Sequence, residues 1–294
     1  MNGVQSAFTV DIEDGISIAM RDAFSVKSEQ TGRVVSLTKQ ILKLLDDYNT
    51  KGTFFVLGQV TEKFPRLVKQ IANEGHELGV HGYNHLQFFK MTKDDAFNEI
   101  DRAKKLIEDI SGKEVLGHRA PAFSITPATR WGLDVVARAG FEYDSSIMPI
   151  RGNRYGWNGF PEHITKIATP NGSEIIEVPM SVINVMGQRM PVCGGGYLRL
   201  FPKWITQKAF NKITEKRPAI VYIHPYELDT ERYPDYYFEQ LNKSGFLKRN
   251  KMKSMWWNRK TVYSKLSSLL EIYEFGTMNK VINDYNIGQN VFQT

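Results

Sequence analysis

The sequence has a single cysteine, Cys193, and lacks any long apolar run among its 294 residues. One cysteine excludes an intramolecular disulfide framework, and we expect Cys193 to be a small apolar filler because no histidine lies near it in the sequence. No stretch of about 18 apolar residues is present, so we expect no bilayer-spanning helix. The amino terminus has neither a basic cluster nor an apolar stretch of signal-peptide length. These absences predict a soluble protein of a reducing compartment, the cytoplasm.

Hydrophobic residues make up 41% of the chain and aromatic residues 12%, enough for the core of one large domain or two small ones. Intrinsic disorder is not expected, because such a composition can bury a substantial apolar surface. The sequence contains neither internal repeats nor a low-complexity tract.

The net charge of +6 is unevenly distributed, and residues 243–260 hold a dense share of it beside Trp256 and Trp257. A basic and aromatic segment suits an anionic partner such as a membrane surface, a nucleic acid, or a nucleotide or lipid diphosphate. The alternative is a solvated basic segment whose tryptophans pack inward. Because no nucleic-acid motif is present, we expect no nucleic-acid binding. Peripheral contact with an anionic membrane, at the inner face, remains a hypothesis.

Strand-like and helix-like segments alternate along the first part of the chain. We expect strands at residues 7–12, 53–57, 77–80, 115–117, 141–143, 174–178 and 219–223, and helices at 34–48, 61–73, 92–110, 126–138, 201–214 and 262–271. Repeated βα units predict a parallel sheet, open or closed, with its functional residues at the carboxyl ends of the strands.

Polar residues follow several of these expected strands. They are the acids between Asp11 and Asp14, the pair His81 and His85, Arg119, and His224. Two histidines four residues apart can direct both imidazoles toward one point if the backbone is helical, which makes them a candidate metal site. A hydrolytic zinc site also needs a third protein ligand, a general base and a general acid. The other strand-end residues are of the types that supply these groups.

Glycine and proline are frequent in residues 150–172, which we expect to be a long loop. Residues 187–199 contain another turn-rich piece, Cys193-Gly-Gly-Gly-Tyr197, which lacks the ending of a phosphate-binding loop. We expect both segments to shape a substrate cleft, with Tyr197 contacting the substrate.

Five short motifs in this order resemble those of the polysaccharide deacetylases of carbohydrate esterase family 4. They are Thr9-Val-Asp-Ile-Glu-Asp14, the histidine pair in His81-Gly-Tyr-Asn-His85, Arg119-Ala-Pro-Ala-Phe123 with one extra residue, Asp144-Ser-Ser146, and the final histidine of Val221-Tyr-Ile-His224. Gly194-Gly-Gly-Tyr-Leu-Arg199 and His224-Pro-Tyr-Glu227 resemble a subgroup found with bacterial exopolysaccharide and surface-glycan loci.

The resemblance implies an α/β fold, a distorted (β/α) barrel of about seven parallel strands. It also implies one catalytic domain over residues 1–294, with a family-specific portion from about residue 225. A divalent metal, Zn²⁺ by expectation, would be held by His81, His85 and one carboxylate. Asp11 would be the general base, and Arg119 would orient it and keep it ionised.

The remaining groups of the reaction follow from the same resemblance. His224 would protonate the leaving amine as general acid, a role suited to a side chain that titrates near neutrality. A backbone N–H near Phe123 would stabilise the oxyanion, which places Phe123 among the expected substrate-binding residues.

The sequence departs from the family pattern in two places. The usual adjacent acids are separated here, so the carboxylate ligand is Asp14 or Glu13, and we favour Asp14. Strand alternation puts Glu13 on the same face as Asp11, unless the strand ends or bulges there. Ile147 and Met148 stand where the family often has an acid and a tryptophan. The group that tunes His224 must then come from elsewhere, with Glu227 and Asp229 as candidates.

The favoured function is removal of N-acetyl groups from an amino sugar in a bacterial polysaccharide or its lipid-linked precursor. A second hypothesis is another amide hydrolysis on the same scaffold, for instance of a cyclic ureide such as allantoin. A third is a catalytically silent glycan-binding protein.

Overall fold

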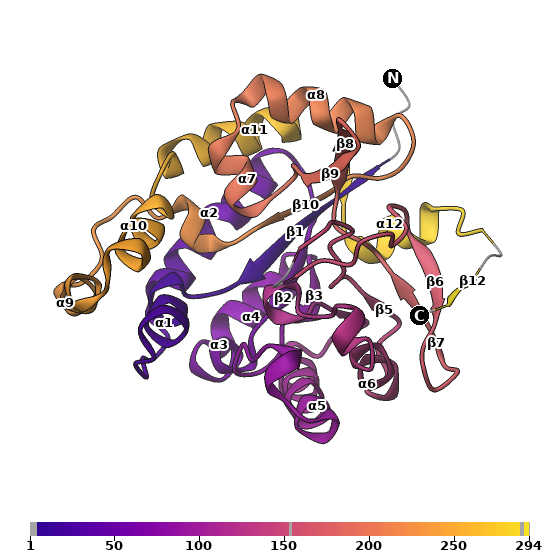
Figure 1. Cartoon of the computed structure of the whole chain (residues 1–294), viewed down its shortest axis with the longest axis horizontal. Helices are drawn as coiled ribbons and strands as arrows, with labels where there is room; N and C mark the ends of the chain where they lie inside the picture. The colour runs from indigo at the N-terminus through magenta and orange to yellow at the C-terminus, as the bar shows by residue number, and fades with distance from the viewer. Residues whose placement is uncertain (1–4, 153–154, 289–290, 294) are drawn as a thin grey trace.

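The computed structural model describes residues 5–152, 155–288 and 291–293. Its centre is a 10-stranded sheet in the order β10-β1-β2-β3-β4-β5-β7-β6-β12, with β11 paired to β1. Helices cover this sheet, and Figure 1 shows it running through the middle of the molecule. The loop expected over 150–172 includes residues 153 and 154, which lie outside the described residues.

Seven consecutive strands of the sheet are parallel to one another. They are β10 (Ile220–Ile223), β1 (Ser6–Ile12), β2 (Thr53–Val56), β3 (Glu77–Val80), β4 (Gly117–His118), β5 (Tyr143–Asp144) and β7 (Glu174–Glu177). Among the described residues no pairing joins β10 to β7, so the curved sheet stays open between them. The expected distorted barrel of parallel strands is confirmed.

Helices follow most of these strands in sequence, as the βα pattern predicts. They are α2 (Arg33–Asp47), α3 (Gly58–Lys63), α4 (Pro65–Asn73), α5 (Lys93–Ser111), α6 (Gly132–Arg138), α7 (Gly195–Leu200), α8 (Lys203–Thr214) and α11 (Val262–Ile272). In α2, Leu37, Ile41 and Leu45 recur at helical spacing and are buried against the sheet. The start of α5 is fixed by a capping box between Thr92 and Asp95.

Two expected helices are interrupted. The helix expected over 61–73 is two helices, because Phe64 adopts a non-helical conformation (φ −128°, ψ 57°) before Pro65 begins α4. The helix expected over 126–138 begins with a 3₁₀ turn at Pro127–Thr129 and becomes α-helical only at Gly132. Both prolines occupy a first helical position, where no N–H is required.

The expected loop over residues 150–172 contains a strand, β6 (Thr165–Ala168), which pairs antiparallel with β7. A two-stranded sheet, β8 (Val182–Val185) with β9 (Gln188–Pro191), was also not expected. Two short strands extend the main sheet, β11 (Phe275–Gly276) beside β1 and β12 (Val291–Gln293) beside β6. The outer part of the sheet is therefore larger than the βα pattern indicates.

A small C-terminal lobe packs beside the carboxyl end of β1. It contains α9 (Asp235–Lys243) and α10 (Phe246–Ser254), which lie at the left edge of Figure 1 beside α1 (Gly15–Ile18). A cluster of buried side chains, among them Ile16, Met20, Tyr233, Tyr237 and Leu241, joins the lobe to the segment after β1. The remaining elements are a π-helix at Ala19–Ala23, α12 (Met278–Asp284), and 3₁₀ turns at Phe88–Lys90, Pro121–Phe123, Pro225–Leu228 and Arg259–Thr261.

Two expectations from the composition can be compared with the fold. Cys193 is buried, and burial raises the pKa of its thiol to about 12, which suits a structural side chain and not a nucleophile. Within the described ranges, no helix has both the length and the apolar character needed to cross a bilayer.

Candidate active site

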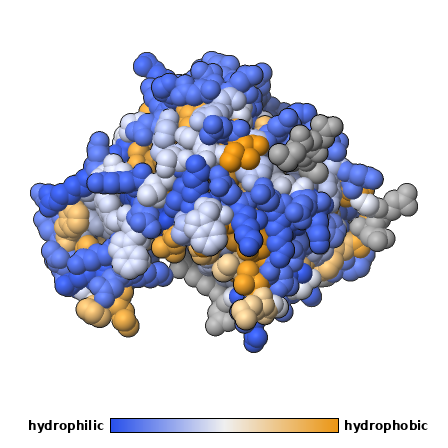
Figure 2. All heavy atoms as spheres, turned by 90° about the horizontal axis from the view of Figure 1, so that it is seen from above, coloured by the Kyte–Doolittle hydropathy of each residue, from blue (hydrophilic) through white to orange (hydrophobic). Residues whose placement is uncertain are grey.

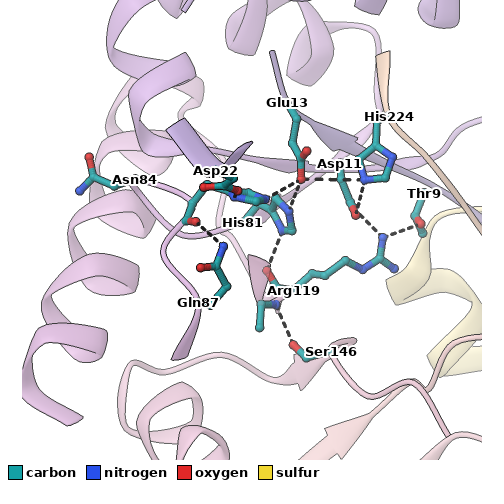
Figure 3. A network of polar contacts seen from close by, with 12 residues as sticks. Thr9, Asp11, Glu13, Asp22, His81, Asn84, Gln87, Arg119, Ser146 and His224 are labelled. Atoms are coloured by element: carbon teal, nitrogen blue, oxygen red, sulfur yellow. Dashed lines mark hydrogen bonds and ion pairs between the residues drawn. The ribbon is translucent and has the colours of Figure 1, made fainter. Parts of the chain in front are cut away.

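The candidate site lies at the carboxyl ends of β1, β3, β4 and β10, where the expected residues meet in one buried network (Figure 3). Asp11 is the next-to-last residue of β1, and Glu13 follows that strand. His81 follows β3, Arg119 follows β4, and His224 follows β10. Because these strands are parallel members of one sheet, with only β2 between β1 and β3, their ends bring side chains far apart in sequence to the same edge.

Glu13 and the two histidines form a compact group of ligating atoms. Glu13 Oε1 lies 2.9 Å from His81 Nε2 and 2.9 Å from His85 Nε2, and all three side chains are buried. The three atoms lie within 4.8 Å of one another. Two imidazoles and one carboxylate form a donor set that proteins use for catalytic zinc and for other divalent metals. The group therefore fits a divalent metal ion.

Asp14 does not join this group. Our prediction that Asp14 is the carboxylate ligand was wrong, because Glu13 and not Asp14 lies beside the two histidines. Asp14 is the N-cap of α1: its Oδ1 accepts hydrogen bonds from the backbone N–H groups of Ile16 (2.9 Å) and Ser17 (3.1 Å). Its Oδ2 accepts one from the backbone N–H of Thr31. A carboxylate that caps a helix start in this way points along the helix and away from the histidines.

The histidine pair converges through a turn, and so without the helical backbone that the H-x-x-x-H spacing alone would need. Gly82 (φ +76°) and His85 (φ +56°) adopt left-handed conformations, and no residue between them is helical. A left-handed histidine is unfavourable, and such conformations concentrate at functional sites. The turn gives both Nε2 atoms the same target, which is Glu13 Oε1.

The second ring nitrogen of each histidine has its own partner. His81 Nδ1 donates to the backbone carbonyl of Arg119 at 2.8 Å. His85 Nδ1 lies 2.8 Å from Arg21 Nη2 and 3.6 Å from the carboxylate of Asp22. An acceptor beside Nδ1–H, as the Arg119 carbonyl is for His81 and the Asp22 carboxylate can be for His85, fixes the ring orientation of a metal-binding histidine. Sequence reasoning missed Arg21 and Asp22, which lie on the π-helix and carry no motif.

Glu13 is ionised at neutral pH. Burial opposes its charge, but His85, His224 and the hydrogen bonds from His81 and His85 hold the pKa of Glu13 well below its usual value. An ionised carboxylate beside two imidazoles is the state in which these side chains bind a metal.

Asp11 and Arg119 meet as the sequence predicted. Arg119 Nη1 donates to Asp11 Oδ1 at 2.7 Å and to Thr9 Oγ1 at 2.8 Å. The guanidinium is fully buried, with its carbon 4.2 Å from the centre of the Phe55 ring. A buried arginine held on several sides fixes the orientation of the carboxylate that it contacts. The other carboxylate oxygen, Asp11 Oδ2, faces His224 Nε2 at 3.9 Å.

His224 completes the group. Its Nε2 lies 3.9 Å from Glu13 Oε1, and its Nδ1 contacts Glu227 Oε1 at 3.1 Å. Burial opposes the imidazolium, but Glu13, Glu227 and Asp11 outweigh it and raise the pKa of His224 to about 9. Of the two expected tuning groups, Glu227 contacts the histidine, whereas Asp229 pairs with Arg33 at 2.9 Å.

The third motif accommodates its extra residue by a backbone distortion. Ala122 (φ +55°) and Phe123 (φ +51°) are both left-handed. The N–H of Phe123 donates to the Ala120 carbonyl at 3.1 Å, so that N–H is already engaged and does not match the expected oxyanion donor. The Phe123 ring lies edge to face against Tyr222, with 5.0 Å between the ring centres.

The triple-glycine segment, which packs on Tyr222, places Tyr197 beside this aromatic group. Gly194 packs directly on Tyr222, where a Cβ would meet the Tyr222 carbonyl oxygen at 2.2 Å. Burial and a hydrogen bond with Tyr155 raise the pKa of Tyr197 to about 12. Tyr155, which the sequence did not single out, also packs with Phe123 and Tyr222 in one apolar cluster. These rings form an aromatic wall beside His224, which contacts the Tyr222 ring at 5.9 Å.

Two different protein families match two successive parts of the chain. Residues 29–143 match the family described as polysaccharide deacetylase, and residues 145–283 match a domain of unknown function, DUF3473. A peptidoglycan-N-acetylglucosamine deacetylase of Bacillus cereus is 31% identical over 153 residues, covering 48% of this chain and 54% of that protein. The chain therefore spans about half the length of this curated relative.

Two crystal structures share the fold along most of the chain. A candidate polysaccharide deacetylase of Mycobacterium smegmatis has a TM-score of 0.62 at 20% identity and covers 96% of this chain and 90% of its own. A pseudoenzyme of carbohydrate esterase family 4 from Bacillus anthracis has a TM-score of 0.54 at 12% identity and covers 100% of this chain and 70% of its own. Residues 29–143 are therefore similar to polysaccharide deacetylases, and the chain has a fold that is also found in carbohydrate esterase family 4.

Proposed function

We propose that the protein is a metal-dependent hydrolase that removes N-acetyl groups from an amino sugar of a glycan. The observation that carries this proposal is the meeting of Glu13, His81 and His85 with Asp11 and His224 at one edge of the sheet. Deacetylases of this family are metal-dependent. The curated relative from Bacillus cereus is named for the N-acetylglucosamine of peptidoglycan, which supports an N-acetylated amino sugar as substrate.

In this proposal His81, His85 and Glu13 hold the metal, and Zn²⁺ is the ion that best suits two imidazoles and a carboxylate. Such an ion would polarise the acetyl carbonyl and would lower the pKa of a water molecule, so that this water gives up its proton more readily and attacks as hydroxide. His81 Nδ1–H donates to the Arg119 carbonyl, and the Asp22 carboxylate is the neighbour of His85 that can accept from its Nδ1–H, so each ring has an acceptor that holds it in place.

Asp11 is the general base of the proposed reaction. Its Oδ1 is occupied by Arg119, so its Oδ2, on the side of His224, is the oxygen that takes a proton from the attacking water. Arg119 keeps Asp11 oriented, because its guanidinium is buried and held by neighbouring groups. A base fixed in this way is already held in the orientation that proton transfer requires.

His224 is the general acid of the proposed reaction. With a pKa of about 9 it carries a proton at neutral pH, and Nε2 is the atom that gives this proton to the leaving amine. Glu227 holds Nδ1, and the Tyr226 ring stacks on the imidazole with 4.7 Å between centres. Both contacts keep Nε2 directed toward Asp11 and Glu13.

The glycan would lie against the aromatic wall formed by Phe123, Tyr197 and Tyr155. Aromatic rings suit the apolar faces of sugar rings, and the tyrosine hydroxyls can bond to sugar hydroxyls. This position is supported by the contacts of Phe123 and of His224 with Tyr222.

The fold alone does not decide between an active and a silent protein, since a pseudoenzyme shares it. The complete set of proposed base, acid and metal ligands favours activity here. Acetate release from N-acetylglucosamine oligomers and from peptidoglycan, measured with Zn²⁺ and with a chelator, tests the proposal. We expect acetate with Zn²⁺ and none with the chelator. Turnover of allantoin without acetate would instead support the ureide alternative, and neither activity nor metal binding would support a silent glycan-binding protein.

We further propose that α10 and the residues after it rest on an anionic membrane surface, at the inner face in a cytoplasmic protein. Residues 243–260 contain lysine and arginine but no aspartate or glutamate. Phe246, Leu247 and Trp257 are 75%, 84% and 62% exposed, whereas Trp256 packs inward on Tyr233. Figure 2 shows hydrophobic surface atoms among hydrophilic ones at this end of the molecule. Exposed apolar and basic groups together suit an interface of acidic lipid.

Sedimentation with lipid vesicles tests this contact. We expect binding to vesicles that contain phosphatidylglycerol, weaker binding at high salt, and none to vesicles of phosphatidylcholine alone. The double variant Phe246→Ser, Leu247→Ser should lose binding, whereas Trp204→Ser, an exposed apolar residue on α8, should keep it. Equal binding by both variants would contradict the proposed surface, as would binding to nucleic acid in place of vesicles.

A further inference from the structure

Ser145 holds Arg119 on the side opposite to Asp11. Arg119 Nε donates to the Ser145 carbonyl at 3.1 Å, and Arg119 Nη2 donates to Ser145 Oγ at 3.1 Å. The hydroxyl of Ser145 in turn donates to the Val178 carbonyl at 2.8 Å. Both Ser145 and Arg119 are fully buried. The guanidinium is thus held along its Nε–Nη2 edge by one residue, while Nη1 extends to Asp11.

The neighbours of Ser145 make matching contacts with the neighbours of Arg119. Asp144 Oδ1 contacts His118 Nδ1 at 2.7 Å, and Ser146 Oγ accepts a hydrogen bond from the N–H of Ala120 at 2.7 Å. Ser146 Oγ also donates to Asp144 Oδ1 at 2.7 Å. The last residues of β4 and β5 and the two residues after each are therefore joined one to one, with Ser145 at the middle position.

The carboxyl groups of Glu177 and Asp144 form a buried pair beside this segment. Burial and the nearby Asp144 carboxylate raise the pKa of Glu177 well above its usual value, so that Glu177 keeps its proton and can donate it in a hydrogen bond to Asp144. Glu177 Oε1 also accepts from the N–H of Ile147 at 2.8 Å. Glu177, Asp144 and Ser146 are all fully buried. The backbone around Ser145 consequently has little freedom to move.

Two contacts along one edge fix the plane of a guanidinium, because its donors lie in a rigid fork. The direction of Nη1 follows from that plane. Without the Ser145 hydroxyl, Nη2 would lose its acceptor, and a buried donor without a partner drives a side chain to a new orientation. The hydroxyl of Ser145 therefore helps to fix the hydrogen bond from Nη1 to Asp11, although it does not touch Asp11 itself.

We propose that Ser145 is a positioning residue for the reaction: it orients Arg119 so that Nη1 holds Asp11 in place. This inference rests on the proposed function, in which Asp11 is the general base. It gives the fourth motif, Asp144-Ser-Ser146, a task that its resemblance to the family did not specify.

The variant Ser145→Ala tests the proposal against Ser181→Ala, which removes a buried hydroxyl that accepts from the N–H of Ile220. We expect Ser145→Ala to lower kcat about tenfold with KM changed less than about twofold, because a misplaced base affects the chemical step and not binding. Ser181→Ala should leave kcat within about twofold of the wild type even if it unfolds at a lower temperature. Equal kcat for Ser145→Ala and the wild type would overturn the proposal.

A double-mutant cycle separates positioning from a merely structural effect. Lysine has no fork, so in the Arg119→Lys background Ser145→Ala should cause no further loss of kcat, whereas independent effects would multiply. A crystal structure of Ser145→Ala gives a readout that needs no activity: Nη1 of Arg119 should lie beyond hydrogen-bonding distance of Asp11. If the guanidinium of Arg119 stays in place in this variant, the proposal for Ser145 is wrong. A wild-type protein that releases no acetate would instead count against the proposed function alone.

Discussion

Glu13 and Asp14 are adjacent carboxylates with different tasks, because the chain passes from strand to helix between them. Glu13 continues the alternation of β1 and lies on the same side as Asp11, toward the histidines. Asp14 begins α1 and bonds to its free N–H groups. The sequence left this choice open, since it depends on whether the side-chain alternation of β1 continues to residue 13, one residue past the end of the strand.

Asp11→Asn should keep the metal but lose most of the activity. Asparagine preserves the shape of Asp11 but cannot accept a proton, so we expect kcat to fall by a factor of about 10²–10⁴. Asp11 is not among the three grouped ligands, so metal content measured by atomic absorption should be unchanged. His81→Ala, the matched ligand variant, should lose both metal and activity. A fully active Asp11→Asn enzyme would show that the base is another residue.

We expect the fold to lose stability in acid because the buried ring of His76 must then take up a proton. Its Nδ1 accepts a hydrogen bond from the N–H of Gly52 at 3.1 Å, which requires the neutral ring. Burial and then Lys51 lower the pKa of His76 to about 4, below the value of about 6.5 expected in the unfolded chain. The unfolded state therefore binds more protons between these values. The stabilising contribution is present above about pH 6.5 and is lost as the pH falls toward about 4, by up to about 1.4 kcal/mol per unit.

Urea denaturation at several pH values measures this effect. The variant His76→Gln cannot take up the proton, so the decline of its free energy of unfolding between pH 6.5 and 4 should be shallower than that of the wild type. The same decline in both proteins would rule out His76 as the source.

At the scale of elements, periodicity and caps predicted most of the parallel sheet and its helices. The capping box of Thr92 and Asp95 marks the start of α5, and the expected site residues His81, Arg119 and His224 do follow strands. The β8–β9 hairpin was missed because its turn places Met186 at φ +51° before Gly187 at φ +80°. Asparagine or glycine normally occupies such a left-handed position, so the sequence carries no usual hairpin signal there.

Gly194→Ala should weaken the junction between the triple-glycine segment and β10. A Cβ at Gly194 would lie 2.2 Å from the Tyr222 carbonyl oxygen, a backbone atom that cannot move aside. Overpacking of this kind lowers the free energy of unfolding by about 1–3 kcal/mol. Because Tyr222 precedes the strand end that carries His224, kcat should fall as well.

The matched control for this substitution is Gly196→Ala. There the nearest contact of a new Cβ is Nη2 of Arg199 at 3.3 Å, which needs a shift of only a few tenths of an ångström. Chemical denaturation and acetate release should be close to those of the wild type. Equal stability of the two alanine variants would mean that the chain relaxes around Gly194.

At the scale of the whole molecule, the candidate site exists only because the parallel sheet brings distant segments together. Asp11 and His224 lie at the ends of neighbouring strands, β1 and β10, although most of the chain separates them in sequence. The order of the motifs predicted that these residues share a site, but neither their distances nor their supporting contacts. Ser145 under Arg119 and Tyr155 beside Tyr197 depend on packing that no spacing in the sequence records.

The central claim is that a metal held by Glu13, His81 and His85 is needed to release acetate, and one pair of variants tests it most directly. Asp14→Asn keeps a good helix cap, whereas Glu13→Gln removes the proposed ligand charge. Zinc content and acetate release from N-acetylglucosamine oligomers should be measured on both purified proteins. We predict that Glu13→Gln loses metal and activity together while Asp14→Asn keeps both. Retention of metal and activity by Glu13→Gln would contradict the account.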